Sequence, residues 1–211
     1  MLIVLKAELH SHSSISDGKD SVRSLVESAV AKNLNVLSVT DHDTVQGSLE
    51  AVDIVREEHL PLIIIPGIEI TTSSGHVLAY GVTEDIEAGM SMVETCEAVR
   101  LLGGMCFLAH PFDFIRGGSV RLADFKVVDG IEVYNSKSYF NFLALRFAKK
   151  LSKPGIAGSD AHLADSVGTA VTLLSEKMDL LESLFHAEYN GRRASIKDRF
   201  AFLLFRLNRR L

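Results

Sequence analysis

Short apolar runs alternate with amphipathic stretches along the 211-residue chain. The apolar runs predict strands at 2–5, 36–39, 62–65, 76–81, 105–109, 127–133, 155–158 and 169–174. Apolar residues at helical spacing predict helices at 20–33, 49–56, 92–102, 139–151 and 180–189. This alternation of short strands with amphipathic helices is typical of β–α units and of a largely parallel sheet, so we expect an α/β fold.

The positions of the polar residues distinguish between two possible folds, a closed barrel and an open sheet. Most of the conspicuous ones come at or just after the end of a predicted strand: His10, His12, His42, Glu69, His110, Asp160 and His162. His76 differs, because it begins a strand. An open sheet gathers such residues only near its switch point, whereas a barrel brings every strand's carboxyl end to one rim. We therefore expect a closed barrel of about seven strands.

Six of the eight histidines belong to this pattern. His10 and His12 alternate with Leu9 and Ser11, so the two imidazoles would emerge on the same side of a strand. With Asp17 and the two strand-end carboxylates, the histidines make nine potential ligands, and imidazole with carboxylate suits zinc, manganese or iron. Nine groups are too many for one ion, so we expect two or three divalent ions and a shared carboxylate. His59 and His186 are expected to be ordinary surface or helix-end residues.

The ordered motifs resemble those of the PHP family, named for polymerase and histidinol phosphatase. They are His10-x-His12, Thr40-Asp41-His42-Asp43, Pro66-Gly67-Ile68-Glu69, the His76 strand, Ala109-His110-Pro111 and Ser159-Asp160-Ala161-His162. The resemblance extends over residues 7–173. It implies a distorted seven-stranded (β/α)7 TIM-like barrel, a metal cluster at its carboxyl rim and hydrolysis of phosphate esters.

The resemblance also implies how the ligands divide. One ion would take His10, His12, Glu69 and Asp160, a second Glu69, His76 and His110, and a third Asp17, His42 and His162. Some family members have histidine where this chain has Asp17, and the harder carboxylate favours manganese or iron over zinc. Many members have aspartate where this chain has Glu8, which precedes the ligands and bears on their surroundings.

Our candidates for catalysis are Glu69, Asp160 and Arg116. Water held by the ions would have a depressed pKa and could attack phosphorus as hydroxide. Arg116 lies in the loop after the His110 strand, where it would bind a phosphate oxygen or remain a solvated loop residue. Asn135 and Lys137 are weaker candidates of the same kind.

Asp41 and Asp43 surround His42 in the sequence. Each is a candidate for orienting a metal-bound histidine or, equally, for capping the helix that follows Thr40.

Charge and cysteines add three expectations. Net charge is −5, with +6 in residues 191–211 and −11 before them, so the chain has no global nucleic-acid footprint. Cys96 and Cys106 form no Cys-x-x-Cys pair and fall in predicted regular elements, so we expect buried reduced thiols and a cytoplasmic location. The apolar start, residues 1–5, is too short for a signal peptide or a transmembrane helix.

Two segments follow from these patterns: a barrel at 1–190 and a basic amphipathic helix or tail at 191–211. Apolar residues of the tail share one helical face, whereas Phe202 and Phe205 lie off it beside arginines. Packing on the barrel is the ordinary interpretation of that face. The two off-face aromatics indicate a second contact, with a partner subunit, an anionic membrane surface or a nucleic-acid backbone. We favour a homodimer through the tail, because the −11 charge of the preceding residues should repel both polyanions and anionic lipid.

The leading hypothesis is a metal-dependent phosphoesterase acting on a phosphorylated small metabolite, a nucleotide or an oligonucleotide end. Only 33 residues separate His76 from His110, which leaves no room there for an inserted subdomain over the site. The alternatives are a histidinol-phosphate phosphatase, a non-catalytic metal-binding PHP module and amidohydrolase-like cleavage of C–N bonds.

Overall fold

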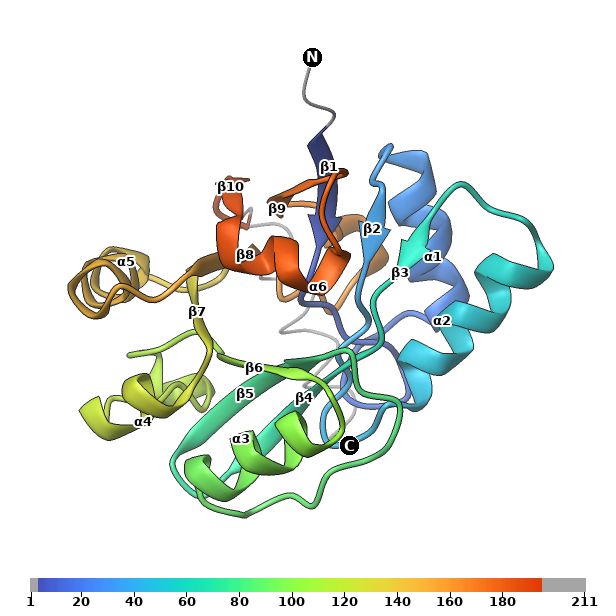
Figure 1. Ribbon diagram of the computed structural model, residues 1–211. Helices are drawn as coiled ribbons and strands as arrows, with labels where there is room; N and C mark the ends of the chain where they lie inside the picture. The colour runs from blue at the N-terminus through green and yellow to red at the C-terminus, as the bar shows by residue number, and fades with distance from the viewer. Residues whose placement is uncertain (1–3, 195–211) are drawn as a thin grey trace.

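A computed structural model describes residues 4–194 of the chain, which form two five-stranded sheets (Figure 1). The first sheet has the order β10-β9-β1-β2-β3, and the second runs in chain order from β4 to β8. The strands of the first sheet are β1 (Val4–Glu8), β2 (Val36–Leu37), β3 (Ile63–Ile64), β9 (Ala170–Ser175) and β10 (Glu188–Gly191). Those of the second are β4 (Gly67–Thr72), β5 (Gly75–Tyr80), β6 (Met105–Leu108), β7 (Gly130–Asn135) and β8 (Gly155–Gly158).

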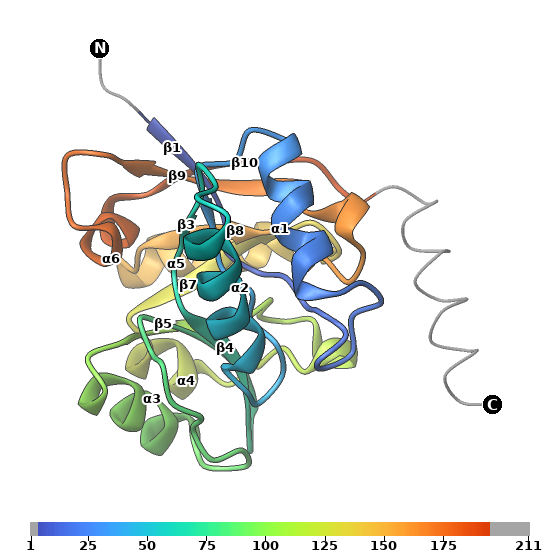
Figure 2. The same ribbon diagram turned by 90° about the vertical axis from the view of Figure 1, so that its right-hand side faces the viewer.

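Six α-helices lie within the described residues, together with 3₁₀ turns at Phe114–Arg116, Ala164–Ser166 and Leu184–His186. The helices are α1 (Val22–Ala31), α2 (Gln46–Glu57), α3 (Met92–Leu101), α4 (Leu122–Val127), α5 (Asn141–Leu151) and α6 (Leu180–Ser183). One apolar core joins α1 and α2 to the first sheet, and another joins α3, α4 and α5 to the second. Figure 2 shows β1, β9 and β10 in the upper part of the molecule and α3 and α4 in the lower part.

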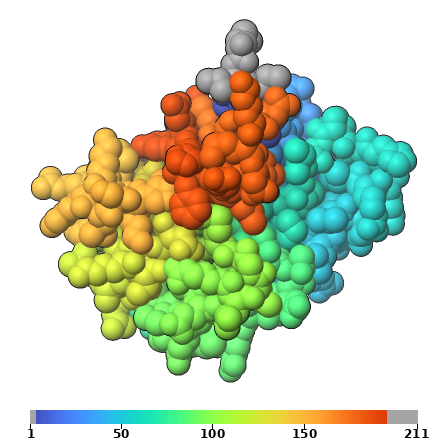
Figure 3. All heavy atoms as spheres, in the orientation of Figure 1, coloured from blue at the N-terminus to red at the C-terminus, as the bar shows by residue number. Residues whose placement is uncertain are grey.

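A third core draws side chains from both sheets and fills the space between them. It contains Leu9, Leu78, Tyr80 and Phe107, and the Tyr80 hydroxyl donates to the Leu9 carbonyl at 2.9 Å. Leu184 is buried in this core, so the segment around α6 packs across one end of it. That segment, in orange and red, covers the middle of the face shown in Figure 3.

Only half of the strand pairs within the described residues are parallel. The runs β1-β2-β3 and β6-β7-β8 pair in parallel, whereas β1-β9, β9-β10, β4-β5 and β5-β6 are antiparallel. The prediction of a largely parallel sheet therefore needs correction. Only Ser73 and Ser74 connect β4 to β5, and so short a link permits a hairpin but no crossover.

The two sheets do not join into the predicted closed seven-stranded (β/α)7 barrel. Two isolated parallel bridges connect them, Ser11 with Ala161 and His42 with Glu69. Between β8 and the first sheet, side chains take the hydrogen bonds that a neighbouring strand would make. The Thr172 hydroxyl bonds both the N–H and the C=O of Ala157.

Glu8 adds to these side-chain hydrogen bonds between β8 and the first sheet. Its carboxylate accepts hydrogen bonds from the backbone N–H groups of Ser159, at 2.9 Å, and Gly168, at 2.7 Å. Because side-chain oxygens satisfy these backbone groups, the ladder of the first sheet does not continue into β8.

Two further elements differ from the prediction. The segment 122–127 is a helix, and the strand expected from Val127 begins only at Gly130. The last predicted helix ends at Ser183 although Asp179 caps its start, and β10 then pairs with β9. This long-range pairing overrides the local helical pattern.

The predicted tail helix lies almost wholly at 195–211, outside the described residues. The division at residue 190 and the homodimer therefore stay predictions. No helix within residues 4–194 is both long and apolar enough to span a membrane.

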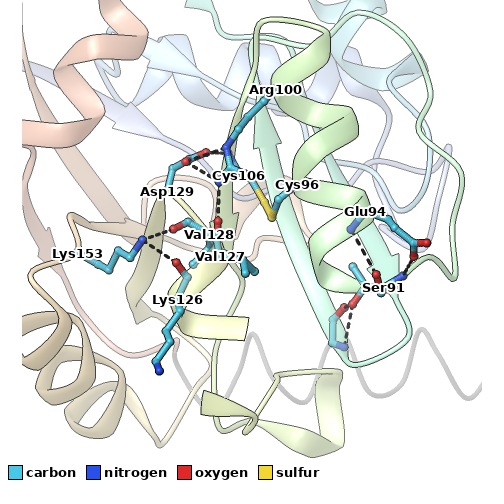
Figure 4. Close-up of a disulfide and its surroundings, with 12 residues drawn as sticks. Ser91, Glu94, Cys96, Arg100, Cys106, Lys126, Val127, Val128, Asp129 and Lys153 are labelled. Carbon is cyan, nitrogen blue, oxygen red and sulfur yellow. Dashed lines mark hydrogen bonds and ion pairs between the residues drawn. A yellow bond between two sulfur atoms is a disulfide. The ribbon is translucent and has the colours of Figure 1, made fainter. Parts of the chain in front are cut away.

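The prediction of reduced thiols was wrong, because Cys96 on α3 and Cys106 on β6 form a disulfide with a Cα–Cα distance of 5.6 Å (Figure 4). The expectation of a cytoplasmic location loses the argument on which it depended. Asp129 lies beside the bond and accepts hydrogen bonds from the Cys106 N–H and from Arg100. The disulfide therefore fastens α3 to a strand whose end leads to His110.

Reduction should destabilise the protein. For a loop of this length the chain-entropy model gives about 3 kcal/mol of unfolding free energy, which urea denaturation with and without dithiothreitol would measure. The Cys96→Ala/Cys106→Ala double variant is the control, because dithiothreitol should leave its midpoint unchanged. Alkylation of both thiols in denaturant without reductant would contradict the bond.

Candidate metal centre

All nine predicted ligand residues lie in one cluster, and Glu69 on β4 is its centre. Glu69 is buried, and both of its carboxylate oxygens face imidazole rings. Oε1 lies 3.0 Å from His76 Nδ1 and from His110 Nε2, and Oε2 lies 3.1 Å from His10 Nε2, 3.0 Å from His12 Nε2 and 3.6 Å from His42 Nδ1. These rings come from both sheets, so Glu69 stands where the sheets meet.

Asp17, in the turn after β1, faces three other ring nitrogens. Its Oδ1 lies 3.1 Å from His162 Nε2, 3.8 Å from His12 Nδ1 and 3.9 Å from His42 Nε2. The two longer distances exceed hydrogen-bonding range, so space remains between the carboxylate oxygen and those two ring nitrogens.

Asp160, after β8, receives cationic side chains. Its Oδ2 contacts the Arg116 guanidinium directly and accepts a hydrogen bond from Asn135 Nδ2 at 3.1 Å. Its Oδ1 lies 3.3 Å from Lys137 Nζ and 3.2 Å from His162 Nδ1. The three residues predicted as phosphate-binding candidates thus meet at a single carboxylate.

The cluster fits divalent transition metals. Among the described residues, five groups of three side chains each offer ligand atoms within 4.8 Å of one another, and His10, His12, His42, Glu69 and Asp160 each belong to more than one group. His12 Nδ1 and His110 Nδ1 are buried and have no hydrogen-bond partner among residues 4–194. Buried polar atoms normally have partners, and a set of imidazole nitrogens and carboxylate oxygens is what zinc, manganese or iron binds.

The carboxylates also set the protonation of the rings. Burial disfavours the charged form of Glu69, but the charges of His10 and His42 outweigh burial and hold the pKa of Glu69 well below its usual value. Burial would lower the pKa of His10, but Glu132 and Glu69 raise it to about 9. Burial lowers the pKa of His12 to about 4, which leaves that ring neutral, the form that binds metal.

Glu132, on β7, is a residue that the sequence analysis missed. It is fully buried, and its Oε1 lies 2.9 Å from His10 Nδ1. Its Oε2 accepts hydrogen bonds from the backbone N–H of His110, at 2.7 Å, and from Asn135 Nδ2, at 3.1 Å. A charged residue inside the apolar run Gly130–Asn135 was the available signal.

Gly158 makes room for the pair of His10 and Glu132. A Cβ at this position would lie 2.4 Å from His10 Cβ and 2.8 Å from Glu132 Oε1, which is closer than real contacts.

Asp41 and Asp43 orient loops, and within residues 4–194 neither carboxylate makes a hydrogen bond to a histidine or caps the helix that follows. Asp41 accepts hydrogen bonds from Ser13 and Ser16 and so fixes the loop that leads to Asp17. Asp43 accepts from the N–H and hydroxyl of Thr71 on β4. The helix that follows, α2, has no side-chain cap.

His59 and His186 lie outside the cluster, as expected. His59 is in the turn after α2, and His186 ends a 3₁₀ turn.

Two site residues hold unusual backbone conformations. His110 and Asp160 have positive φ angles, 24° and 53°, and each is the second residue after its strand, β6 or β8. Such conformations cost on the order of 1–3 kcal/mol in a non-glycine residue and persist where surrounding contacts enforce them. For His110, the hydrogen bond to Glu132 is one of those contacts.

The chain belongs to the PHP family. The model of the PHP domain matches residues 8–145, and the PHP-associated C-terminal model matches residues 138–188. The family resemblance inferred from the sequence is thereby confirmed.

Two relatives match this chain over different lengths. Uncharacterized protein MJ0417 of Methanocaldococcus jannaschii is 32% identical over 184 residues, 82% of this chain and 71% of that protein. The 5'-3' exoribonuclease Rnm of Escherichia coli is 40% identical over 65 residues, but these make up 31% of this chain and 22% of the enzyme.

Among solved structures, one is a two-domain protein from Bacteroides vulgatus that is described as containing a predicted PHP-like metal-dependent phosphoesterase. It superposes with a TM-score of 0.75 at 18% identity, covering 90% of this chain and 66% of that one. At this identity the likeness shows the fold alone.

Glu132→Gln should weaken metal binding. A glutamine oxygen can still accept from His10, but its NH₂ group then faces two other donors, the His110 N–H and Asn135 Nδ2. Loss of a carboxylate that orients a metal-binding histidine typically lowers metal affinity about 10-fold to 100-fold. Titration calorimetry with Mn²⁺ on chelator-stripped protein would measure this change. Glu87→Gln, at an exposed position, is the matched control. Unchanged affinity in Glu132→Gln would mean that Glu132 does not support the site.

Proposed function

We propose that this protein is a metal-dependent phosphoesterase. The observation that carries the proposal is the juxtaposition at one cluster of a buried, histidine-surrounded carboxylate, Glu69, and a second carboxylate, Asp160, that contacts two cationic side chains. The first arrangement suits divalent cations, and the second places positive charge where a phosphate would approach them.

Two or three divalent ions would share the nine ligands in the arrangement that the family resemblance implies. His10, His12, Glu69 and Asp160 would hold one ion, Glu69, His76 and His110 a second, and Asp17, His42 and His162 a third. Glu69 suits the bridging role because its two oxygens face different sets of rings. The carboxylate of Asp17 favours manganese or iron over zinc.

Bound ions of this kind supply Lewis acidity, which lowers the pKa of water and offsets charge on phosphoryl oxygens. The protein itself supplies orientation. Glu132 keeps the His10 ring and the His110 backbone in place, and Asn135 holds Arg116 through its amide oxygen at 3.4 Å. With substrate bound, Arg116 and Lys137 would turn from Asp160 toward the phosphate oxygens, and Asp160 would be left to an ion.

A phosphorylated small metabolite, a nucleotide or an oligonucleotide end is the substrate class we propose. The named relative that acts on RNA and the phosphodiesterase of Eggerthella lenta, which is 32% identical over 87 residues, 38% of this chain and 32% of that enzyme, both cleave phosphoester bonds by their names and support this choice.

A panel of phosphate monoesters, diesters, histidinol phosphate and amides tests the function directly. The manganese-loaded protein should hydrolyse at least one phosphate ester, lose that activity in chelator and regain it when Mn²⁺ is returned. Glu69→Gln removes the central charge, so elemental analysis should find at least two ions fewer per chain and little activity. Full activity in metal-free protein, or hydrolysis of amides alone, would overturn the proposal.

Arg116→Ala should raise KM for the best ester about 10-fold or more, because a charge-assisted contact to phosphate is lost. Metal content by elemental analysis should stay at the wild-type value. Arg56→Ala, which removes an exposed arginine paired with Asp53, is the control. A fall in bound metal with unchanged KM would instead assign Arg116 to balancing the charge of Asp160.

A further inference from the structure

Two loops at the metal centre share one design. In the loop after β6, Arg116 reaches inward to Asp160, whereas its neighbours Phe114 and Ile115 are 69% and 83% exposed. In the loop after β7, Lys137 reaches the same carboxylate, and Tyr139 is 58% exposed. Each loop therefore directs a cation to the cluster and also carries exposed aromatic or apolar side chains.

The two loops are adjacent, because Asn135 joins them. Its Oδ1 accepts hydrogen bonds from Arg116, at 3.4 Å, and from the backbone N–H of Lys137, at 3.0 Å. The Arg193 guanidinium lies 5.0 Å from the Tyr139 ring centroid and adds positive charge beside that aromatic surface.

The first loop is fixed directly to a metal-ligand candidate. The His76 N–H donates to the Gly117 carbonyl at 2.9 Å, and a Cβ on Gly117 would lie 2.5 Å from the His76 ring. Gly117 has a φ of 80°, which also favours glycine. The backbone of Phe114 and Ile115 is thus held at a set distance from the cluster.

We propose that Phe114, Ile115 and Tyr139 form a base-binding rim, a subsite that takes the nucleobase of a nucleoside phosphate while Arg116 and Lys137 take its phosphate. The inference rests on the proposed function and narrows its substrate. Aromatic and apolar side chains beside arginine are what bases stack on, whereas a simple sugar phosphate leaves this surface in water. A mononucleotide and an oligonucleotide end present the same chemistry.

Kinetics on the manganese-loaded protein test the rim. The value of kcat/KM for adenosine 5'-monophosphate should exceed that for ribose 5-phosphate by about 10-fold or more, a base-stacking effect. In Phe114→Ala/Ile115→Ala that ratio should fall toward one. Leu101→Ala is the matched control, because Leu101 is 88% exposed where α3 ends, at the opposite end of the adjoining strand from His110.

A 5'-phosphorylated dinucleotide distinguishes the two sources of the base, since a rim that takes an oligonucleotide end should favour it over the mononucleotide. Equal kcat/KM for ribose 5-phosphate and both nucleotides, with no effect of the double variant, overturns the rim and leaves the phosphoesterase proposal intact. Absence of hydrolysis for every ester overturns the proposed function, and a ligand-binding measurement then tests the base-binding rim.

Binding is measurable because the chain contains no tryptophan. Phe114→Trp introduces a single tryptophan at the rim, and a slowly hydrolysed adenosine 5'-phosphorothioate should quench its fluorescence at concentrations where ribose 5-phosphate does not. Leu101→Trp should respond to neither. Equal quenching by both ligands in Phe114→Trp, or none by either, overturns the base-binding rim.

Discussion

The charge of one buried carboxylate organises this molecule. Glu69 is almost fully removed from solvent, and an unpaired charge there would cost several kcal/mol. Five imidazole rings lie within 3.0–3.6 Å of its oxygens, and they arrive from segments spread between His10 and His110. The charges of His10 and His42 compensate that of Glu69. The antiparallel hairpin of β4 and β5, which departs from simple β–α repetition, is what brings His76 back beside Glu69. The same concentration of nitrogen and oxygen donors makes the centre suitable for cations.

The centre is electrostatically two-sided. Glu69 and Asp17 present negative charge to the rings, whereas Arg116 and Lys137 bring positive charge to Asp160. This division matches a phosphate ester, whose anionic oxygens need both cations in the cluster and fixed positive side chains. It also explains why the side chain of Asn135, which bears no charge, has four hydrogen-bond partners. It binds the Arg116 side chain and the Lys137 backbone, and joins both to the carboxylates of Glu132 and Asp160.

The gathering of seven of the nine ligand residues could be predicted from the sequence, because each stands at or just after the end of a predicted strand. His76, which begins a strand, and Asp17, which lies in a turn, do not follow that rule. Glu132 was missed because its role depends on which rings it meets across two other strands. The missing backbone ladder between β8 and the first sheet could not be predicted for a similar reason. Side-chain hydrogen bonds of Glu8 and Thr172 replace backbone ones there, and no periodic sequence pattern indicates this. The pairing of β10 with β9 and the bond between Cys96 and Cys106 likewise depend on contacts distant from the local pattern.

The small number of backbone hydrogen bonds between the two sheets has a thermodynamic consequence. His10, Asp17 and His42 belong to the first half of the molecule, whereas Glu69, His110 and Asp160 belong to the second, and the backbone bridges between the halves lie at these same residues or their immediate neighbours. Any ion bound by both sets is a crosslink between halves that otherwise share few backbone bonds. By mass-action linkage, one such ion at 100 times its dissociation constant adds about 2.7 kcal/mol to the folded state. An ion bound in this way would be a cohesive element of the fold, and the resistance of the protein to unfolding would then depend on the metal supply.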